Sequence, residues 1–219
     1  MRPDLIIFDC DGVLIDSETV ANRVVAQEMT RLGWAMDADE SMRQFLGMNI
    51  GDMQPKIEAR LGITLPPEWR RAMADQLIEV LKEEAELIPG ADAMLEKVNA
   101  LGFDWRIASN SSDEEMAVKF ARTGLSEITA GRCISAGRVI ARGGRAKPAP
   151  DVFLEAAADA RIAPERCIVL EDSVLGTRAA VAAGMVAYGY DPHGDGAKLL
   201  AEGSVRVFSQ LEQIFEVLA

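Results

Sequence analysis

The chain has 219 residues, 49% of them hydrophobic, and a formal net charge of −12 at pH 7. That length and apolar content are enough for a substantial buried core with a second lobe, while the acidic balance argues against general binding to nucleic acid or to anionic membranes. Apolar runs fall short of the roughly 20 residues of a membrane span and the first residues lack a signal-peptide pattern, so we expect a cytoplasmic protein.

The first predicted element is a strand at Leu5–Phe8, a continuous apolar run followed directly by Asp9 and Asp11. Side chains two apart on an extended chain point to the same side, and Gly12 allows the backbone to turn away tightly. Two neighbouring carboxylates resist being ionised together unless a cation lies between them or one keeps its proton. The spacing therefore predicts a chemical site, although an edge strand ending in a polar turn has the same pattern.

The segment after this strand has a helical pattern instead. Apolar residues recur at helical spacing and no convincing strand interrupts them, so we predict an all-helical insertion at residues 17–86. The α/β core is then made of residues 1–16 and 87–219. The alternative is that these helices are simply part of one compact domain. The pattern begins with Val20, Val24, Met29 and Leu32 and continues in the predicted helices Ser41–Leu46, Met53–Leu61 and Glu68–Glu86.

The rest of the chain alternates between short strand-like runs and longer helical patterns. This alternation predicts an α/β fold with a parallel, Rossmann-like sheet. The predicted strands are Trp105–Ala108, Cys167–Leu170, Met185–Gly189 and Val205–Phe208. The predicted helices are Ala91–Leu101, Glu114–Thr123, Asp151–Ala160, Leu175–Ala183 and Leu211–Leu218.

Polar residues follow several of these strands. Ser109 and Asn110 end one strand just before a helix, where a phosphate could bind, although a simple N-cap is by itself the commoner explanation. Glu171 and Asp172 end another strand. Because ligands of open α/β sheets gather beyond the carboxyl ends of the strands, we expect these residues to lie near Asp9.

Four segments, taken in order, resemble the motifs of the haloacid dehalogenase superfamily of aspartate-nucleophile phosphotransferases. The resemblance spans nearly the whole chain, and it implies that the insertion is a mobile cap joined to the core near Asp16–Ser17 and Leu87–Pro89. The segments are Asp9-Cys10-Asp11-Gly12-Val13 with Asp16-Ser17-Glu18, Ile107-Ala108-Ser109-Asn110, Lys147-Pro148-Ala149-Pro150-Asp151 and Ile168-Val169-Leu170-Glu171-Asp172-Ser173.

The resemblance also implies roles for individual residues. Asp9 is expected to be the nucleophile that forms an aspartyl-phosphate, and Asp11 the general acid and base. Ser109, Asn110 and Lys147 are expected to bind the phosphate. By itself, Lys147 before two prolines would be an ordinary loop residue ahead of a new helix.

A magnesium ion is the implied cofactor. Its expected ligands are Asp9, the Asp11 backbone carbonyl, Glu171 and Asp172, because a hard cation prefers oxygen ligands. Such an ion makes the clustered carboxylates tolerable and screens Asp9 from the charge of the substrate.

We therefore expect a magnesium-dependent phosphatase, similar to the branch related to β-phosphoglucomutase. Its partner is expected to be a small phosphorylated metabolite, either a sugar phosphate or a sugar-acid phosphate, with no nucleic acid or membrane partner. Dehalogenases and phosphonoacetaldehyde hydrolases lack an acid at the position of Asp11, which sets them aside. The sequence leaves the oligomeric state open.

A phosphosugar mutase is the closest alternative, because its cap must hold a second phosphate. Here Ala21 takes the position of the mutase's histidine, and Leu46 and Ile50 stand where lysine and arginine are expected. Arg23 and Lys56 are explained more simply as solvated helix charges. A non-catalytic binding protein of the same fold is less well supported, since every expected catalytic residue is present.

Other conspicuous residues are explained without catalysis. His193, the only histidine, lies in a turn-like segment and is expected at the surface or at the rim of the substrate site. Arg142 and Arg145 flank two glycines before Lys147; they are expected to be solvated loop charges, although they could also steer an anion.

The cysteines are odd in number, widely separated and set in apolar surroundings. We therefore expect buried free thiols rather than disulfides or a metal cluster, which suits a reducing cytoplasm. They are Cys10, Cys133 and Cys167.

Overall fold

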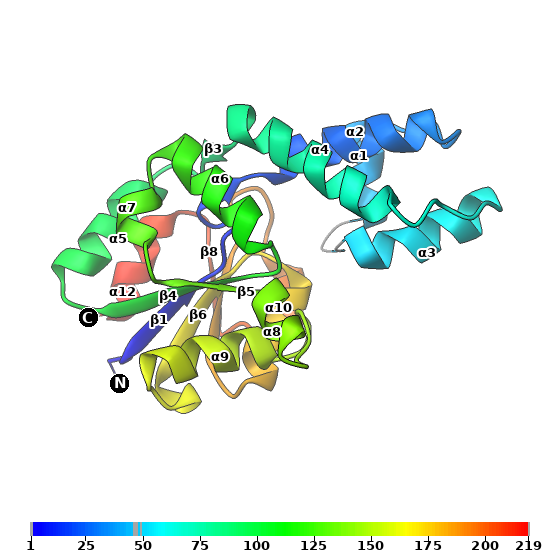
Figure 1. The fold of residues 1–219 in the computed structure, drawn as a ribbon. Coiled ribbons are helices and arrows are strands. Elements are labelled where there is room, and N and C mark those ends of the chain that lie inside the picture. The colour runs from blue at the N-terminus through cyan, green and yellow to red at the C-terminus, as the bar shows by residue number, and fades with distance from the viewer. Residues whose placement is uncertain (1, 46–47, 49, 219) are drawn as a thin grey trace.

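The computed structural model describes residues 2–45, 48 and 50–218. A six-stranded sheet in the order β5-β4-β1-β6-β7-β8 forms its centre, and all neighbouring strands are parallel (Figure 1). Parallel neighbours require crossover connections, which in this core contain helices. The predicted parallel, Rossmann-like core is confirmed. Its strands are β1 (Leu5–Phe8), β4 (Asp104–Ser109), β5 (Cys133–Ser135), β6 (Cys167–Glu171), β7 (Val186–Tyr190) and β8 (Arg206–Phe208).

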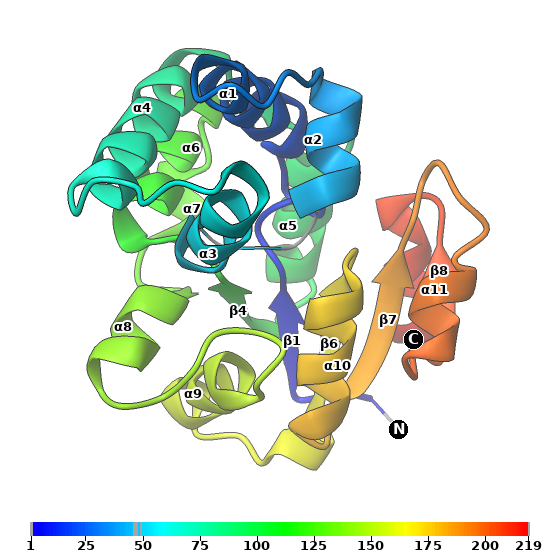
Figure 2. The same ribbon diagram turned by 90° about the vertical axis from the view of Figure 1, so that its right-hand side faces the viewer.

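Strand β1 lies inside the sheet, and helices cover both of its faces (Figure 2). Ile6 and Phe8 join one hydrophobic cluster, while Leu5 and Ile7 point the other way and join a second. A strand buried on both faces needs no polar side, which is why its sequence is a continuous apolar run. The first cluster lies under α5 (Ala91–Ala100), α6 (Asp113–Thr123) and α12 (Phe215–Leu218), and the second under α8 (Ala136–Ala141), α9 (Asp151–Ala160) and α10 (Val174–Ala182).

Several short elements of the core were not predicted. An element of three to six residues is too short to show a hydrophobic period, so the sequence pattern does not reveal it. The final predicted helix is also divided into a 3-10 turn and a short α-helix. The unpredicted elements are β5, α7 (Ser126–Thr129), α8, α11 (Ala197–Ala201) and the 3-10 turn η1 (Pro164–Arg166), and the divided helix consists of η2 (Leu211–Ile214) and α12.

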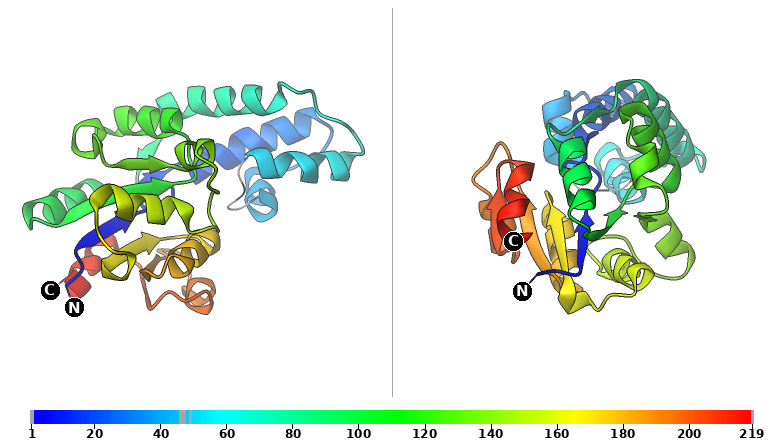
Figure 3. Two further views of the ribbon diagram at one scale, coloured as in Figure 1. Left: turned by 60° about the horizontal axis from the view of Figure 1, so that its bottom comes forward. Right: turned by 90° about the vertical axis from the view of Figure 1, so that its left-hand side faces the viewer.

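Between β1 and α5, the described residues form four helices with a hydrophobic cluster of their own, and we call these helices the helical insertion. Trp69 in this cluster donates its indole N–H to Glu28 Oε1 at 2.8 Å, which ties the last helix to the first. The insertion lies beyond the carboxyl end of β1, while α12 and the start of β1 lie at the opposite end of the core (Figures 1 and 3). None of the described helices has the length and apolar content needed to cross a membrane. The four helices are α1 (Glu18–Arg31), α2 (Ala38–Phe45), α3 (Ile50–Leu61) and α4 (Trp69–Glu84).

One prediction about the insertion was wrong. The helix expected to continue to Glu86 ends at Glu84, and β3 (Glu86–Leu87) pairs with β2 (Ile15–Asp16) in a small antiparallel ribbon. Two-residue strands have no periodicity of their own, and the pairing joins segments about 70 positions apart, so a local pattern cannot show it. The ribbon connects the two points where the chain enters and leaves the insertion.

Candidate active site

The loop after β1 makes a tight turn that presents Asp9 and Asp11. The Asp9 N–H donates to the Leu170 carbonyl at 3.0 Å, and the Gly12 N–H donates to the Ile15 carbonyl at 2.8 Å. Gly12 has a φ of +79°, and a Cβ atom there would lie 1.9 Å from Asp172 Oδ2. Only glycine satisfies both conditions, because it tolerates positive φ and leaves room for the neighbouring carboxylate.

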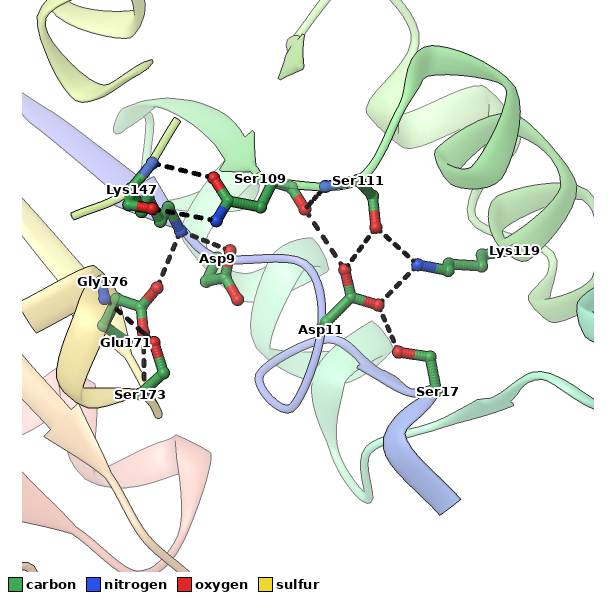
Figure 4. Close-up of polar contacts among 11 residues, drawn as sticks. Asp9, Asp11, Ser17, Ser109, Ser111, Lys119, Lys147, Glu171, Ser173 and Gly176 are labelled. Atoms are coloured by element: carbon green, nitrogen blue, oxygen red, sulfur yellow. Dashed lines mark hydrogen bonds and ion pairs between the residues drawn. The ribbon is translucent and has the colours of Figure 1, made fainter. Parts of the chain in front are cut away.

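Asp9, Lys147 and Glu171 form one buried group at the carboxyl ends of β1 and β6 (Figure 4). The Lys147 ammonium donates to Asp9 Oδ1 at 2.6 Å and to Glu171 Oε1 at 2.7 Å. Asn110 accepts from the Lys147 N–H at 3.0 Å and donates to its carbonyl at 3.4 Å. The Asn110 side chain therefore holds the backbone that carries this ammonium.

The acidic groups beside Lys147 have the geometry of a cation site. Asp9, Glu171 and Asp172 each offer a ligand oxygen, and these oxygens lie within 4.8 Å of one another. Glu171 Oε2 is fixed by the backbone N–H and the hydroxyl of Ser173, at 2.8 and 2.9 Å.

Two of these carboxyl groups resist ionisation unless a cation lies beside them. Burial raises the pKa of Asp9 to about 7; Lys147 opposes this rise and Glu171 adds to it. Burial, and then the charge of Glu171, raises the pKa of Asp172 well above its usual value. These buried ligands are all carboxylate oxygens, and their ionised forms are unfavourable without a nearby positive charge. Such a group of ligands fits a hard divalent cation such as Mg²⁺.

Asp11 lies in a different environment, turned toward α6 and the start of the insertion (Figure 4). Its Oδ1 accepts from the Ser17 hydroxyl and from the Lys119 ammonium, the latter at 2.5 Å. Its Oδ2 accepts from the hydroxyls of Ser111 and Ser109 at 2.7 and 3.2 Å. Burial alone would raise the pKa of Asp11, but the Lys119 ammonium and these hydrogen bonds lower it to about 2.

The contact between Lys119 and Asp11 was missed in the sequence. Lys119 is buried on α6, and its ammonium also donates to Ser111 Oγ at 2.8 Å. Met116 and Phe120 are buried on the same helix, at spacings that place Lys119 in an apolar stripe. A lysine within such a stripe needs an anionic partner, and this was the available signal.

A cavity of about 470 Å³ lies between this end of the core and the helical insertion. Of the described lining, the core contributes Lys119, Lys147 and five carboxylate side chains. The insertion contributes one carboxylate, that of Glu18, and otherwise mainly apolar side chains such as Val25, Phe45 and Met73. Ser109 and Asn110 also line the cavity. The predicted site residues are therefore brought together around one space.

Three other residues noted in the sequence are absent from the described cavity lining. His193 is exposed in the loop after β7. Arg142 forms an ion pair with Glu155, and Arg145 forms one with Asp151 at 3.4 Å. Both arginine side chains are mainly exposed, as expected for solvated loop charges.

The cysteines are free thiols. Cys10 and Cys167 are buried, and Cys133 is half-buried. Burial raises the pKa of the Cys133 and Cys167 thiols to about 11, so both are protonated and poorly reactive at neutral pH.

Comparison with known proteins identifies relatives of the whole chain. Residues 3–184 match the family model of haloacid dehalogenase-like hydrolases. The chain is 26% identical to 6-phosphogluconate phosphatase of Escherichia coli (strain K12), covering 99% of this chain and 95% of that protein. It is 30% identical to hexitol phosphatase A of the same organism, covering 84% and 81%. A crystal structure of a HAD family hydrolase from Deinococcus radiodurans R1 with bound phosphate and sodium has a TM-score of 0.80 at 29% identity, covering 100% and 96%.

Proposed function

The chain belongs to the haloacid dehalogenase-like hydrolases, and from this premise we propose that it is a magnesium-dependent phosphatase. Its substrate is a small phosphorylated metabolite, a sugar phosphate or a sugar-acid phosphate, and the reaction passes through an aspartyl-phosphate. The observation that carries the proposal is the position of Asp9: it lines the cavity within a cluster of metal-type oxygen ligands and accepts a hydrogen bond from Lys147. Both named relatives are phosphatases that act on phosphorylated small molecules.

In the first step an Asp9 oxygen attacks phosphorus and the ester oxygen departs, so that one difficult displacement becomes two easier ones. Lys147 and the Ser109 hydroxyl, with the Asn110 backbone N–H, bind the phosphate oxygens and stabilise their charge. Asp9, Glu171 and Asp172, with the Asp11 carbonyl, would hold Mg²⁺, which when bound supplies positive charge beside the phosphate.

Asp11 handles protons in both steps. Its contacts with Lys119 and three hydroxyls favour the ionised form, which suits removal of a proton from the water that attacks the aspartyl-phosphate. To protonate the departing alkoxide in the first step, Asp11 must first take up a proton and release these contacts, and it then donates that proton to the bridging oxygen of the substrate. The surrounding hydroxyls and the Lys119 ammonium therefore influence when Asp11 accepts or donates a proton.

The helical insertion is proposed to act as a cap, residues 17–86, on a core formed by residues 1–16 and 87–219. Two observations support these boundaries: the insertion has its own hydrophobic cluster, and the β2–β3 ribbon lies where the chain crosses between the two parts. We also propose that the protein acts in the cytoplasm, where its free thiols would stay reduced.

The test is phosphate release from a panel of phosphorylated metabolites and p-nitrophenyl phosphate, with metal-stripped enzyme before and after addition of Mg²⁺. We expect release over many turnovers only with the metal. Failure of the folded, magnesium-loaded protein to release phosphate from every compound would overturn the proposal.

A further inference from the structure

The cavity contains six carboxylate residues but only two residues with a side-chain cation among its described lining, Lys119 and Lys147. Both ammonium groups are buried and already bonded: Lys119 to Asp11, and Lys147 to Asp9 and Glu171, at 2.5 to 2.7 Å. Lys147 is committed to the transferred phosphate in the proposed function. Neither ammonium is left to neutralise a second anionic group of a substrate.

In the described part of the helical insertion, no cationic side chain lines the cavity and could bind such a group. Its described lining is mainly apolar, as Val25, Phe45, Ile50, Met73 and Leu77 illustrate. Two cationic side chains of the insertion, considered in the sequence as possible phosphate ligands, have other partners. Arg23 pairs with Glu84. Lys56 donates to the Gln44 carbonyl and lies over the Phe45 ring.

Glu18 adds a negative charge to this side. It lines the cavity from the first turn of α1, and no residue in the described part of the chain donates a hydrogen bond to its carboxylate or forms an ion pair with it. Burial, and next the charge of Asp11, raises the pKa of Glu18, which shows that negative charge is unfavourable at this position. Among the described residues of the insertion, the other polar side chains that line the cavity are those of Ser17 and Asn22, which already have partners in Asp11 and Ser41.

A second anion on the substrate would therefore be desolvated beside an unpaired carboxylate and apolar walls. Unpaired buried charges are costly, and like charges placed together across a binding site repel one another and weaken binding further. A neutral hydroxyl has the opposite preference, since it can donate to Glu18 while the carbon skeleton contacts the apolar side chains.

We propose that the phosphate being removed is the only charged group of the substrate, and that the remainder is a neutral alcohol with a hydroxyl bound by Glu18. This inference rests on the proposed phosphatase function and chooses between its two substrate classes: neutral sugar or polyol phosphates are accepted, and sugar-acid phosphates and bisphosphates are rejected.

Glucitol 6-phosphate and 6-phosphogluconate form a matched pair for the test, because they differ only in a hydroxymethyl or a carboxylate group at carbon 1. Phenyl phosphate and 4-carboxyphenyl phosphate form a second pair that does not depend on a sugar skeleton. We expect kcat/KM to favour the neutral member of each cleaved pair by about 100-fold, mainly through KM, since a site that leaves a charge unpaired discriminates strongly.

Two variants connect the selectivity to the named residues. Glu18→Gln should raise kcat/KM for the acidic member by about tenfold and reduce the ratio within each pair, because it removes one repulsive charge. Ala21→Lys, which places a cation in the cavity lining, should reduce the ratio further. Glu79→Gln is the control, because Glu79 is exposed on α4 and pairs with Lys82, and it should leave both ratios unchanged.

Two outcomes separate this inference from the proposed function. Magnesium-loaded wild-type protein that releases phosphate from none of these esters, nor from p-nitrophenyl phosphate, would contradict both. Active protein whose kcat/KM values for charged and neutral members lie within threefold of each other, or favour the acid, would overturn the inference alone. Unchanged ratios in Glu18→Gln would also overturn the assigned role of Glu18.

Discussion

The core side of the cavity holds Asp9, Lys147 and Glu171 in buried contacts of 2.6 to 2.7 Å, whereas the insertion side presents apolar side chains such as Met73 and Leu77. The core groups come from strand ends and loops up to 162 positions apart in the chain, and the sheet fixes their mutual positions. The energy of a contact between charged groups at 2.6 to 2.7 Å depends strongly on the positions of the atoms. Apolar contacts, by contrast, each contribute a small free energy that increases with the buried area. The core side is therefore suited to chemistry and the insertion side to the choice of substrate.

This contrast predicts the largest effect for a change at Asp9, the proposed nucleophile. Asp9→Asn should lower kcat by at least about 1,000-fold, because the amide keeps the shape of the carboxylate but cannot attack phosphorus. Phosphate release and circular dichroism should be measured on the same preparation. A folded variant, free of wild-type enzyme, that keeps more than a few per cent of the rate would contradict covalent catalysis by Asp9.

Metal removal should have the next largest effect. EDTA should abolish turnover and Mg²⁺ should restore it, whereas Ca²⁺ should inhibit because its larger, looser coordination shell misplaces the phosphate. Mg²⁺ should also raise the Tm of the wild type with concentration, since a ligand that binds only the folded state stabilises it. Asp172→Asn removes one of the proposed metal ligands and should therefore weaken the increase in Tm with Mg²⁺. Full activity in metal-free buffer, or a wild-type Tm that does not change with Mg²⁺ concentration, would argue against the assigned cation site.

Lys119→Met should show that the ammonium group supports Asp11. The change leaves the Asp11 carboxylate without its ion-pair partner, and breaking such a buried pair typically costs about 3 kcal/mol of unfolding free energy. We also expect kcat for alkyl phosphates to fall by about 100-fold, with a smaller fall for p-nitrophenyl phosphate, whose leaving group needs little protonation.

Lys119→Arg keeps the charge and should recover part of both losses. Urea unfolding and the two substrates measured side by side provide the readouts. Equal loss of kcat for alkyl and aryl esters would indicate a general disturbance of the site rather than an effect on proton transfer by Asp11.

The sequence predicts the core side well for a physical reason. β1 is a continuous apolar run because it is buried on both faces, and the gathering of ligand-binding residues at the carboxyl ends of strands then places Asp9 near Glu171 and Asp172. Each step depends on local patterns or on a general property of parallel sheets. The same reasoning gave the helices of the insertion, because long amphipathic helices show their period directly.

The sequence did not predict contacts that depend on distant partners. Lys119 is 108 positions from Asp11, and nothing in the local pattern of α6 names that partner. Lys56, expected to be a solvated charge, is half-buried and bonded to a carbonyl of α2. In each case the tertiary structure supplies the partner, so a sequence pattern can indicate that one is needed without identifying it.

The smallest expected effect concerns the insertion side and separates a phosphatase from a mutase. A mutase must hold a sugar bisphosphate at both ends and keep water from the aspartyl-phosphate, which requires cationic and proton-handling groups in the insertion. Ala21 and Ile50 line the cavity at two of the positions where such groups are expected, and Leu46, at a third, lies outside the described residues.

With β-glucose 1-phosphate and a catalytic amount of the 1,6-bisphosphate, we therefore expect no glucose 6-phosphate above background. A neutral monophosphate should meanwhile be hydrolysed over many turnovers in the same buffer. A coupled dehydrogenase assay for glucose 6-phosphate and a free-phosphate assay, run together, compare the two rates. Isomerisation faster than phosphate release would mean that the insertion protects the aspartyl-phosphate from water despite its apolar lining, and the division between a catalytic core and a substrate-selecting insertion would have to be redrawn.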